Sequence, residues 1–249
     1  ANSTNNFFRK YKTDIAIVFS AFTDVNAAED QRGDKNGICW KINVDGVKNI
    51  VDSASIYPTK IIFISTDFVF DGENGPYGED DKPGGDLSLM TWYGITKLEG
   101  EKLVETLPNH IILRISFPYR AKYDKKPDFA RKLLESFQNN LELYDNQLIS
   151  PTFTDDIAPA VKLLVENDAK GIYHLSSPQT TTPYDFGLYL AATFKKDVSK
   201  IKAGKLEKSN KGKRPLKVGM KTEKISQFGF TPTLWKDGIV EMARQLGIN

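Results

Sequence analysis

Tyr93 and Lys97 are the pair of side chains in this sequence best suited to exchange a proton with a substrate. They are four residues apart, so on a helix both lie on one face. A lysine ammonium group beside a phenol stabilises the phenolate and is expected to lower the tyrosine pKa toward neutral pH. Thr66, which follows a short apolar run, offers a hydroxyl that could share a substrate oxygen with this phenol. The three groups predict proton transfer at an oxygen while a hydride moves to or from the attached carbon.

A tyrosine and a lysine at this spacing also occur by chance on many helices. Taken alone, the ordinary explanation is a half-buried tyrosine beside a solvated lysine. The position of Thr66 favours the chemical interpretation, because open α/β sheets build ligand sites at the carboxyl ends of their strands.

Short apolar segments rich in β-branched residues predict the strands that would hold these side chains. Their continuous apolar character is typical of parallel strands buried on both faces. We predict strands at Ile15–Phe19, Ile61–Ser65, Ile111–Ile115 and Gly171–Ser176. Apolar residues at helical spacing lie between them, so the order of elements predicts a Rossmann-like, doubly wound parallel α/β sheet.

The second half of the chain is less regular and predicts mainly helices. Thr154 and Thr182 are the predicted N-terminal caps of two of them, and Pro183 occupies a favoured first helical position. We expect a dinucleotide-binding part over residues 1–147 and a smaller, mainly substrate-binding lobe over residues 148–249.

The composition of the 249 residues limits the classes of protein that fit. A single cysteine and two histidines argue against a disulfide scaffold and against a metal centre. The net charge of +2 gives no electrostatic case for nucleic acid, and the basic stretch Lys202–Lys221 lacks interleaved aromatic residues. No apolar run approaches the roughly 20 residues that span a bilayer. These features predict a cytoplasmic globular protein that binds neither nucleic acid nor a membrane.

A glycine-rich turn that holds a dinucleotide pyrophosphate is expected near the start of a complete fold of this kind. Three glycines over Gly72–Gly78 have a suitable spacing, but Pro76 interrupts them and the acidic run Glu79–Asp81 follows. Acidic side chains there would repel a pyrophosphate, so we predict a loop. We expect the missing turn in about fifty residues upstream of Ala1, which leaves the predicted sheet N-terminally incomplete.

Nine segments, in order along almost the whole chain, carry a more specific signal than the tyrosine–lysine pair. The most telling are S-T-D-F-V-F-D-G at 65–72 and Y-G-I-T-K at 93–97. The segments are 20–29, 42–46, 64–72, 77–81, 93–101, 113–119, 145–152, 171–175 and 214–215. With them the sequence resembles the extended short-chain dehydrogenase/reductases, and among these the dTDP-4-dehydrorhamnose reductases.

The resemblance implies the reduction of a 4-keto sugar nucleotide with NADPH or NADH as cofactor. It implies that Tyr93 donates a proton to the keto oxygen and that Thr66 hydrogen-bonds the same oxygen. Lys97 would lower the pKa of Tyr93 and bind the nicotinamide ribose.

The resemblance also implies the binding residues around this centre. The cofactor would border Tyr93 and Lys97 and, besides them, Ser20, Ala21, Thr23 and Asn43. Asn43 would support the active site from behind. Phe117 and Arg214 would join Thr66 in binding the nucleotide sugar, with Arg214 near its phosphates. A homodimer is left open.

Departures from the family pattern leave other functions open. Phe117 stands where the family carries a tryptophan, which weakens any specificity for rhamnose. Phe68 stands where related 4,6-dehydratases carry a catalytic glutamate, so a dehydratase is disfavoured. The alternatives are a non-catalytic NADP-binding regulatory subunit, which would resemble the methionine adenosyltransferase β subunit, and an NDP-sugar 4-epimerase.

Overall fold

A four-stranded parallel sheet forms the centre of the molecule in the computed structural model, which describes residues 2–122, 125–207 and 214–248. Its strand order is β1-β2-β3-β5, and every neighbouring pair is parallel. The strands are β1 (Ile15–Val18), β2 (Lys60–Thr66), β3 (His110–Ile115) and β5 (Gly171–Leu175). The predicted α/β class and all four predicted strands are confirmed.

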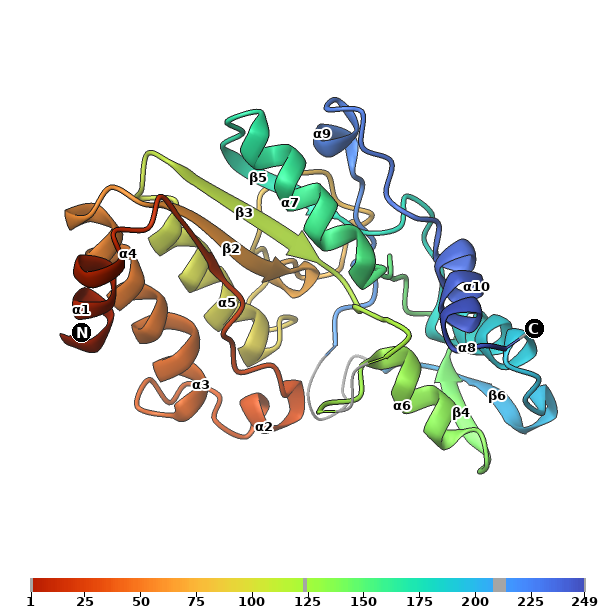
Figure 1. The fold of residues 1–249 in the computed structure, drawn as a ribbon. Coiled ribbons are helices and arrows are strands. Elements are labelled where there is room, and N and C mark those ends of the chain that lie inside the picture. The colour runs from red at the N-terminus through yellow and green to blue at the C-terminus, as the bar shows by residue number, and fades with distance from the viewer. Residues whose placement is uncertain (1, 123–124, 208–213, 249) are drawn as a thin grey trace.

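Helices cover both faces of this sheet (Figure 1). Alternate residues of a strand point to opposite faces. Phe63 therefore packs with the helices of one side, and its neighbour Ile64 packs with those of the other. The first side holds α1 (Asn2–Tyr11), α4 (Val47–Ile56) and α5 (Trp92–Val104), and the second holds α7 (Ile157–Glu166) and α9 (Glu223–Ser226). The doubly wound arrangement is thus present.

Short elements connect β1 to α4 along one flank of the sheet. They are α2 (Val25–Glu29), α3 (Ile38–Trp40) and η1, a π-helical turn (Lys41–Gly46) that runs directly into α4. Single π-helical turns inside α-helices are frequent at functional sites. The helix predicted before β2 is therefore present, with a widened turn in its first half.

A second hydrophobic cluster lies beside the sheet, at the right of Figure 1. It is built from α6 (Phe129–Ser136), β4 (Leu141–Tyr144), α8 (Pro183–Thr193), β6 (Ile201–Gly204) and α10 (Trp235–Gln245). The strands β4 and β6 form a two-stranded parallel sheet that the sequence did not predict. Each has four residues and contains a charged side chain, so neither gives a continuous apolar run.

The two regions interleave along the chain. The strand β5 and helix α7 follow residue 147 but belong to the large sheet and its cover. Conversely, α6 and β4 precede residue 147 and pack in the second cluster. A single boundary at this residue therefore does not separate the two cores, because the chain crosses between them more than once.

Of the two predicted helix caps, Thr182 is confirmed and Thr154 is not. Thr182 caps α8 as predicted, since its Oγ1 accepts a hydrogen bond from the Asp185 backbone N–H (3.0 Å). The prediction for Thr154 is wrong: its hydroxyl donates to the Tyr119 carbonyl, and the 3₁₀ turn η3 (Thr154–Asp156) precedes α7. Among the described residues, no helix combines the length and apolar character needed to cross a membrane.

Candidate active site

Thr66 and Tyr93 come together where β2 ends and α5 begins. Thr66 is the last residue of β2, and the 3₁₀ turn η2 (Asp67–Val69) follows it. Gly94 allows α5 to start against this turn, because a Cβ at this position would overlap the Phe68 carbonyl oxygen. The Thr66 side chain consequently lies near enough to the Tyr93 hydroxyl to lower its pKa through hydrogen bonding. The structure thus brings together two of the three predicted catalytic groups.

Tyr93 is surrounded by groups that favour its neutral form. Burial is the largest influence and raises the pKa of Tyr93 above its ordinary value, and the nearby Asp67 and Cys39 raise it further. The net pKa of Tyr93 is therefore raised rather than brought toward neutral pH as expected, because desolvation of the phenol is the largest influence on it. A phenol with a raised pKa is fully protonated at neutral pH, which is the form a proton donor needs.

Lys97 lies one helical turn further along α5 and is buried, with 2% of its surface exposed. Its Nζ donates to the Ile64 carbonyl oxygen (2.8 Å) and lies 3.8 Å from the centroid of the Phe63 ring. Burial lowers the pKa of Lys97 to about 7, although the negative charge of Glu101 opposes this shift. The ammonium group is therefore held near the carboxyl end of β2, and its charge is sensitive to pH near neutrality.

Asp67 is a buried acid that contacts two hydroxyl groups of the site. Its two carboxylate oxygens accept hydrogen bonds from the Thr66 hydroxyl (2.9 Å) and the Ser116 hydroxyl (2.7 Å). Burial raises the pKa of Asp67 to about 7 despite these hydrogen bonds. Ser116, at the end of β3, was not singled out from the sequence. Its position directly after a predicted strand, like that of Thr66, is the signal that could have identified it.

Asn43 joins the loop after β1 to α5. Its Oδ1 accepts from the Phe22 backbone N–H (2.8 Å), and its Nδ2 donates to the Phe22 carbonyl (3.1 Å) and to Thr96 Oγ1 (2.9 Å). Thr96 Oγ1 in turn donates to the Tyr93 carbonyl (2.9 Å). The π-helical turn η1 presents this buried amide, so Asn43 supports the helix that carries Tyr93 from behind.

The predicted cofactor-binding residues Ser20, Ala21 and Thr23 lie in the loop between β1 and α2. Ser20 and Thr23 are exposed, and Ala21 is half-buried. Lys126, from the loop before α6, donates to Thr23 Oγ1 (2.6 Å) and so places a positive charge over this loop. No sequence signal pointed to Lys126, because the contact joins residues 103 positions apart.

Phe117 lies at the end of β3, with a backbone φ of 39° that non-glycine residues rarely adopt. Its ring makes edge-to-face contacts with Phe68 (centroids 5.9 Å apart) and Phe129 (5.2 Å). Phe68 makes a similar contact with Tyr93 (6.1 Å). An aromatic wall of these rings therefore extends from Tyr93 toward the second cluster, and the substrate role of Phe117 stays a prediction.

Arg214 lies beside α2, the helix that follows the loop with the predicted cofactor-binding residues. Its Nη2 donates to Asn26 Oδ1 on α2 (3.4 Å), and the adjacent Pro215 carbonyl accepts from Gln147 Nε2 (3.0 Å). Arg214 and Lys126 thus place two cations beside α2 and the loop before it. Three lysines of the predicted basic stretch lie outside the described residues: Lys208, Lys211 and Lys213.

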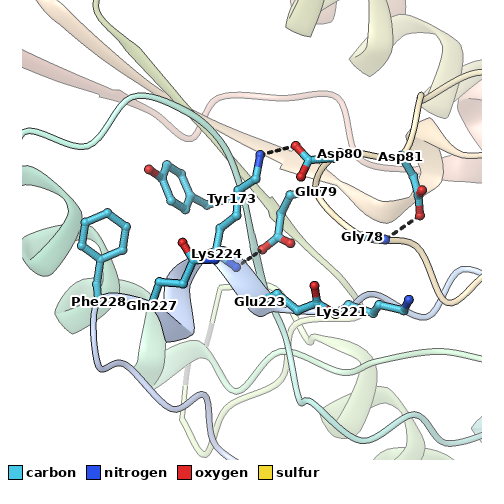
Figure 2. Close-up of a pocket in the computed structure, with 10 residues that line it drawn as sticks. All are labelled: Gly78, Glu79, Asp80, Asp81, Tyr173, Lys221, Glu223, Lys224, Gln227 and Phe228. Atoms are coloured by element: carbon cyan, nitrogen blue, oxygen red, sulfur yellow. Dashed lines mark hydrogen bonds and ion pairs between the residues drawn. The ribbon is translucent and has the colours of Figure 1, made fainter.

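A cavity of about 370 Å³ lies elsewhere, between the loop 78–81 and α9. Figure 2 shows Lys224 reaching Asp80 across it, while the Glu79 carboxylate receives the backbone N–H of Lys224. None of the nine site residues predicted from the sequence lines this cavity. The candidate active site is therefore the polar cluster at the ends of β2 and β3.

Comparisons with known proteins identify the family and the fold. The family model for the RmlD substrate binding domain matches residues 1–248. A dTDP-4-dehydrorhamnose reductase of Sinorhizobium fredii is 34% identical over 192 residues, which cover 73% of this chain and 61% of that protein. The methionine adenosyltransferase 2 subunit beta of Bos taurus is 32% identical over 166 residues, which cover 62% of this chain and 48% of that protein.

Among solved structures, a dTDP-4-dehydrorhamnose reductase from Clostridium acetobutylicum has the same fold with a TM-score of 0.86. It is 27% identical, and the match covers 99% of this chain and 85% of that chain. The Rossmann-like architecture predicted from the sequence is confirmed by this match. The chain thus spans less than two thirds of the Sinorhizobium fredii reductase but most of the Clostridium acetobutylicum structure.

Proposed function

The chain belongs to the RmlD substrate binding domain family, and from this membership we propose that it reduces the 4-keto group of a nucleotide sugar with NADPH or NADH. The observation that carries the proposal is the contact between Tyr93 and Thr66 at the carboxyl end of β2, with Lys97 one turn below. The proton donor Tyr93 and the hydroxyl of Thr66 therefore lie together at the end of one strand.

The proton transfer follows from the state of these groups. Tyr93, kept neutral by burial, donates its proton to the keto oxygen and becomes a phenolate. Thr66 rotates its hydroxyl from Asp67 toward the same oxygen and orients it. The ammonium group of Lys97 stabilises the phenolate electrostatically until solvent returns the proton. The nicotinamide, when bound, supplies the hydride that reaches the carbonyl carbon, so the ketone becomes an alcohol.

The residues present fit the nicotinamide end of the cofactor. The Tyr93 hydroxyl and the Lys97 ammonium group are donors suited to a ribose, and the exposed hydroxyls of Ser20 and Thr23 border the same end of the sheet. Lys126 adds a positive charge that suits a phosphate. We propose that Asn43 acts indirectly, by holding the loop after β1 against α5.

The substrate side of the site is proposed to be the aromatic wall and the segment around Arg214. The edge-on rings of Phe68, Phe117 and Phe129 offer an apolar surface for a sugar ring. Arg214, whose backbone is fixed by the Gln147–Pro215 hydrogen bond, supplies a planar cation suited to a diphosphate.

The test is the oxidation of NADPH by the purified protein in the presence of a dTDP-4-keto-6-deoxy sugar. The Tyr93→Phe variant should lose about two to four orders of magnitude in kcat, because it lacks the donated proton. Tyr11→Phe is the matched control, since Tyr11 is 55% exposed on α1 and should leave the rate unchanged. An unchanged rate in Tyr93→Phe would refute the assigned role.

A second candidate function follows from the match to the methionine adenosyltransferase 2 subunit beta of Bos taurus. The corresponding proposal is a regulatory subunit that binds its partner without turnover of a keto sugar. Stable co-purification with a larger catalytic protein, together with no NADPH oxidation on any keto sugar nucleotide, would support this alternative over the reductase.

A further inference from the structure

A third ionisable residue shares the helix face that carries the proposed catalytic pair. Tyr93, Lys97 and Glu101 follow one another at intervals of four residues on α5, so they lie along one side of the helix. Glu101 is buried, with 1% of its surface exposed. The reduction proposed above assigns it no role.

The direct contacts of Lys97 do not neutralise its charge. Its Nζ meets a backbone carbonyl, that of Ile64, and the face of the Phe63 ring. Burial lowers the pKa of Lys97, and the carboxylate of Glu101, one turn away, is the charged group that raises it. The protonation of Lys97 at neutral pH therefore depends on a negative charge that does not touch it.

Glu101 is itself held by a strand. Both of its oxygens accept hydrogen bonds from Arg114 on β3, from Nε (2.9 Å) and from Nη2 (2.7 Å). Arg114 is fully buried, at 0% exposure. The planar guanidinium group fixes a carboxylate in two directions, so this pair determines where Glu101 lies relative to the sheet.

Arg114 is held in turn from β5. Its Nη1 lies 3.3 Å from His174 Nε2, and His174 Nδ1 lies 3.0 Å from the Lys221 carbonyl oxygen. Because a carbonyl only accepts, Nδ1 carries the proton and Nε2 accepts from Arg114. Burial and the neighbouring Arg114 lower the pKa of His174 to about 3, so the ring stays neutral. A connected polar row thus runs from β5 across β3 to α5.

We propose that Glu101, fixed by Arg114, is a positioning residue that keeps the buried ammonium group of Lys97 charged beside Tyr93. The proposal rests on the reductase function, in which that charge stabilises the tyrosine phenolate. Arg114 acts through Glu101, and neutral His174 completes the row without adding a charge.

The titratable and charged groups linked to this face of α5 come from five elements. Tyr93 and Glu101 lie on α5 with Lys97, Asp67 on η2 and Cys39 on α3 act on Tyr93, Arg114 on β3 binds Glu101, and His174 on β5 contacts Arg114. Only Glu101 is identified as acting on the charge of Lys97. Its removal is therefore the change that isolates the effect.

The experiment is a pH titration of Lys97 by NMR in protein labelled with ¹³C-lysine, with the signal assigned by its loss in Lys97→Met. The wild-type midpoint should lie near 7, and Glu101→Gln should move it down by at least about one pH unit. Glu99→Gln is the matched control, because Glu99 lies on the same helix and pairs with the exposed Lys102. It should leave the midpoint unchanged.

Glu101→Gln leaves Arg114 without its buried counter-ion, so the double variant Glu101→Gln/Arg114→Gln provides a second, charge-free form of the pair. It should also lower the midpoint. An unchanged midpoint in either folded variant, or a wild-type midpoint in the ordinary range for lysine, would overturn the proposal. Because the titration needs no turnover, a lowered midpoint without reductase activity would refute the proposed function alone.

Discussion

At the level of single residues, the pKa values of the side chains in this site are shifted more by burial than by charged neighbours. Tyr93 and Asp67 both have raised pKa values and Lys97 has a lowered one, and desolvation is the largest cause in each case. Desolvation favours the neutral form of every group. At neutral pH the Tyr93 phenol is therefore protonated. The Asp67 carboxyl group and the Lys97 ammonium group both titrate near pH 7.

The raised pKa of Asp67 predicts that the stability of the folded state depends on pH. The unfolded chain releases this proton at a pH of about 4 and the folded chain at about 7, so the folded state loses stability as the pH rises between these values. In the Asp67→Asn variant residue 67 stays neutral, so this loss does not occur. We predict that the unfolding free energy of the variant, relative to that of the wild type, grows by up to about 4 kcal/mol from pH 4 to pH 7.

Urea unfolding of both proteins across this pH range measures the effect. Asp52→Asn serves as the control, because Asp52 is exposed on α4 and its pair with Lys48 should contribute less than about 1 kcal/mol. A difference between Asp67→Asn and wild type that stays constant with pH would show that Asp67 titrates normally.

At the scale of elements, glycine and asparagine residues determine how closely α5 approaches its neighbours. Gly94 lets the helix start against the Phe68 carbonyl, which places Tyr93 beside Thr66. Asn43 then ties the same helix to the loop after β1 through Thr96 and Phe22. The geometry of the site is therefore set by two contacts between the helix and its surroundings.

Asn43→Ala should separate these elements. The substitution leaves the Phe22 N–H and carbonyl groups unpaired, which should cost about 1–3 kcal/mol for each group that remains buried. Thermal unfolding together with the reduction rate measures the effect, and the rate should fall even where the fold persists. Asn49→Ala on α4 is the control, with an expected change below about 0.5 kcal/mol. Equal effects of the two variants would contradict the assigned role of Asn43.

At the scale of the whole molecule, the site is completed by segments far apart in the sequence. Phe68, Ile149 and Val218 form one buried cluster, against which Tyr93 and Phe117 pack. Backbone hydrogen bonds join Leu148 to Leu216 and Val218, and the Gln147 side chain donates to the Pro215 carbonyl. Arg214, next to this segment, contacts α2. Segments far apart in the sequence thus pack beside the residues at the carboxyl end of β2.

Arg214→Ala should weaken the binding of dTDP about tenfold at low ionic strength and less at high ionic strength, because a screened charge contributes less. Isothermal titration calorimetry with dTDP measures this change. Lys217→Ala is the matched control: Lys217 is exposed on the same segment and, within the part of the chain that the structure describes, only its backbone makes a hydrogen bond. A loss of affinity in the control as large as in Arg214→Ala would indicate a general effect of charge.

Much of this arrangement could be predicted from the sequence, for identifiable reasons. The strands of the large sheet are continuous apolar runs, and the Tyr93–Lys97 spacing is local. The four-residue strands β4 and β6 pair with each other across the chain and leave no such pattern. The raised pKa of Tyr93 depends on burial and on Asp67, neither of which its own helix shows. Arg114 lies inside an apolar run, where its pairing with Glu101 is visible only in three dimensions.

A deuterium label on the cofactor follows the proposed hydride transfer directly. The protein is given NADPH carrying deuterium at the transferred position of the nicotinamide, together with a dTDP-4-keto-6-deoxy sugar. We predict that the alcohol product carries one deuterium at carbon 4 of the sugar, detected by mass spectrometry and NMR, and that Tyr93→Phe forms little of it. A reduced sugar without deuterium at that carbon, or no product from a protein that binds both ligands, would contradict the proposed reduction.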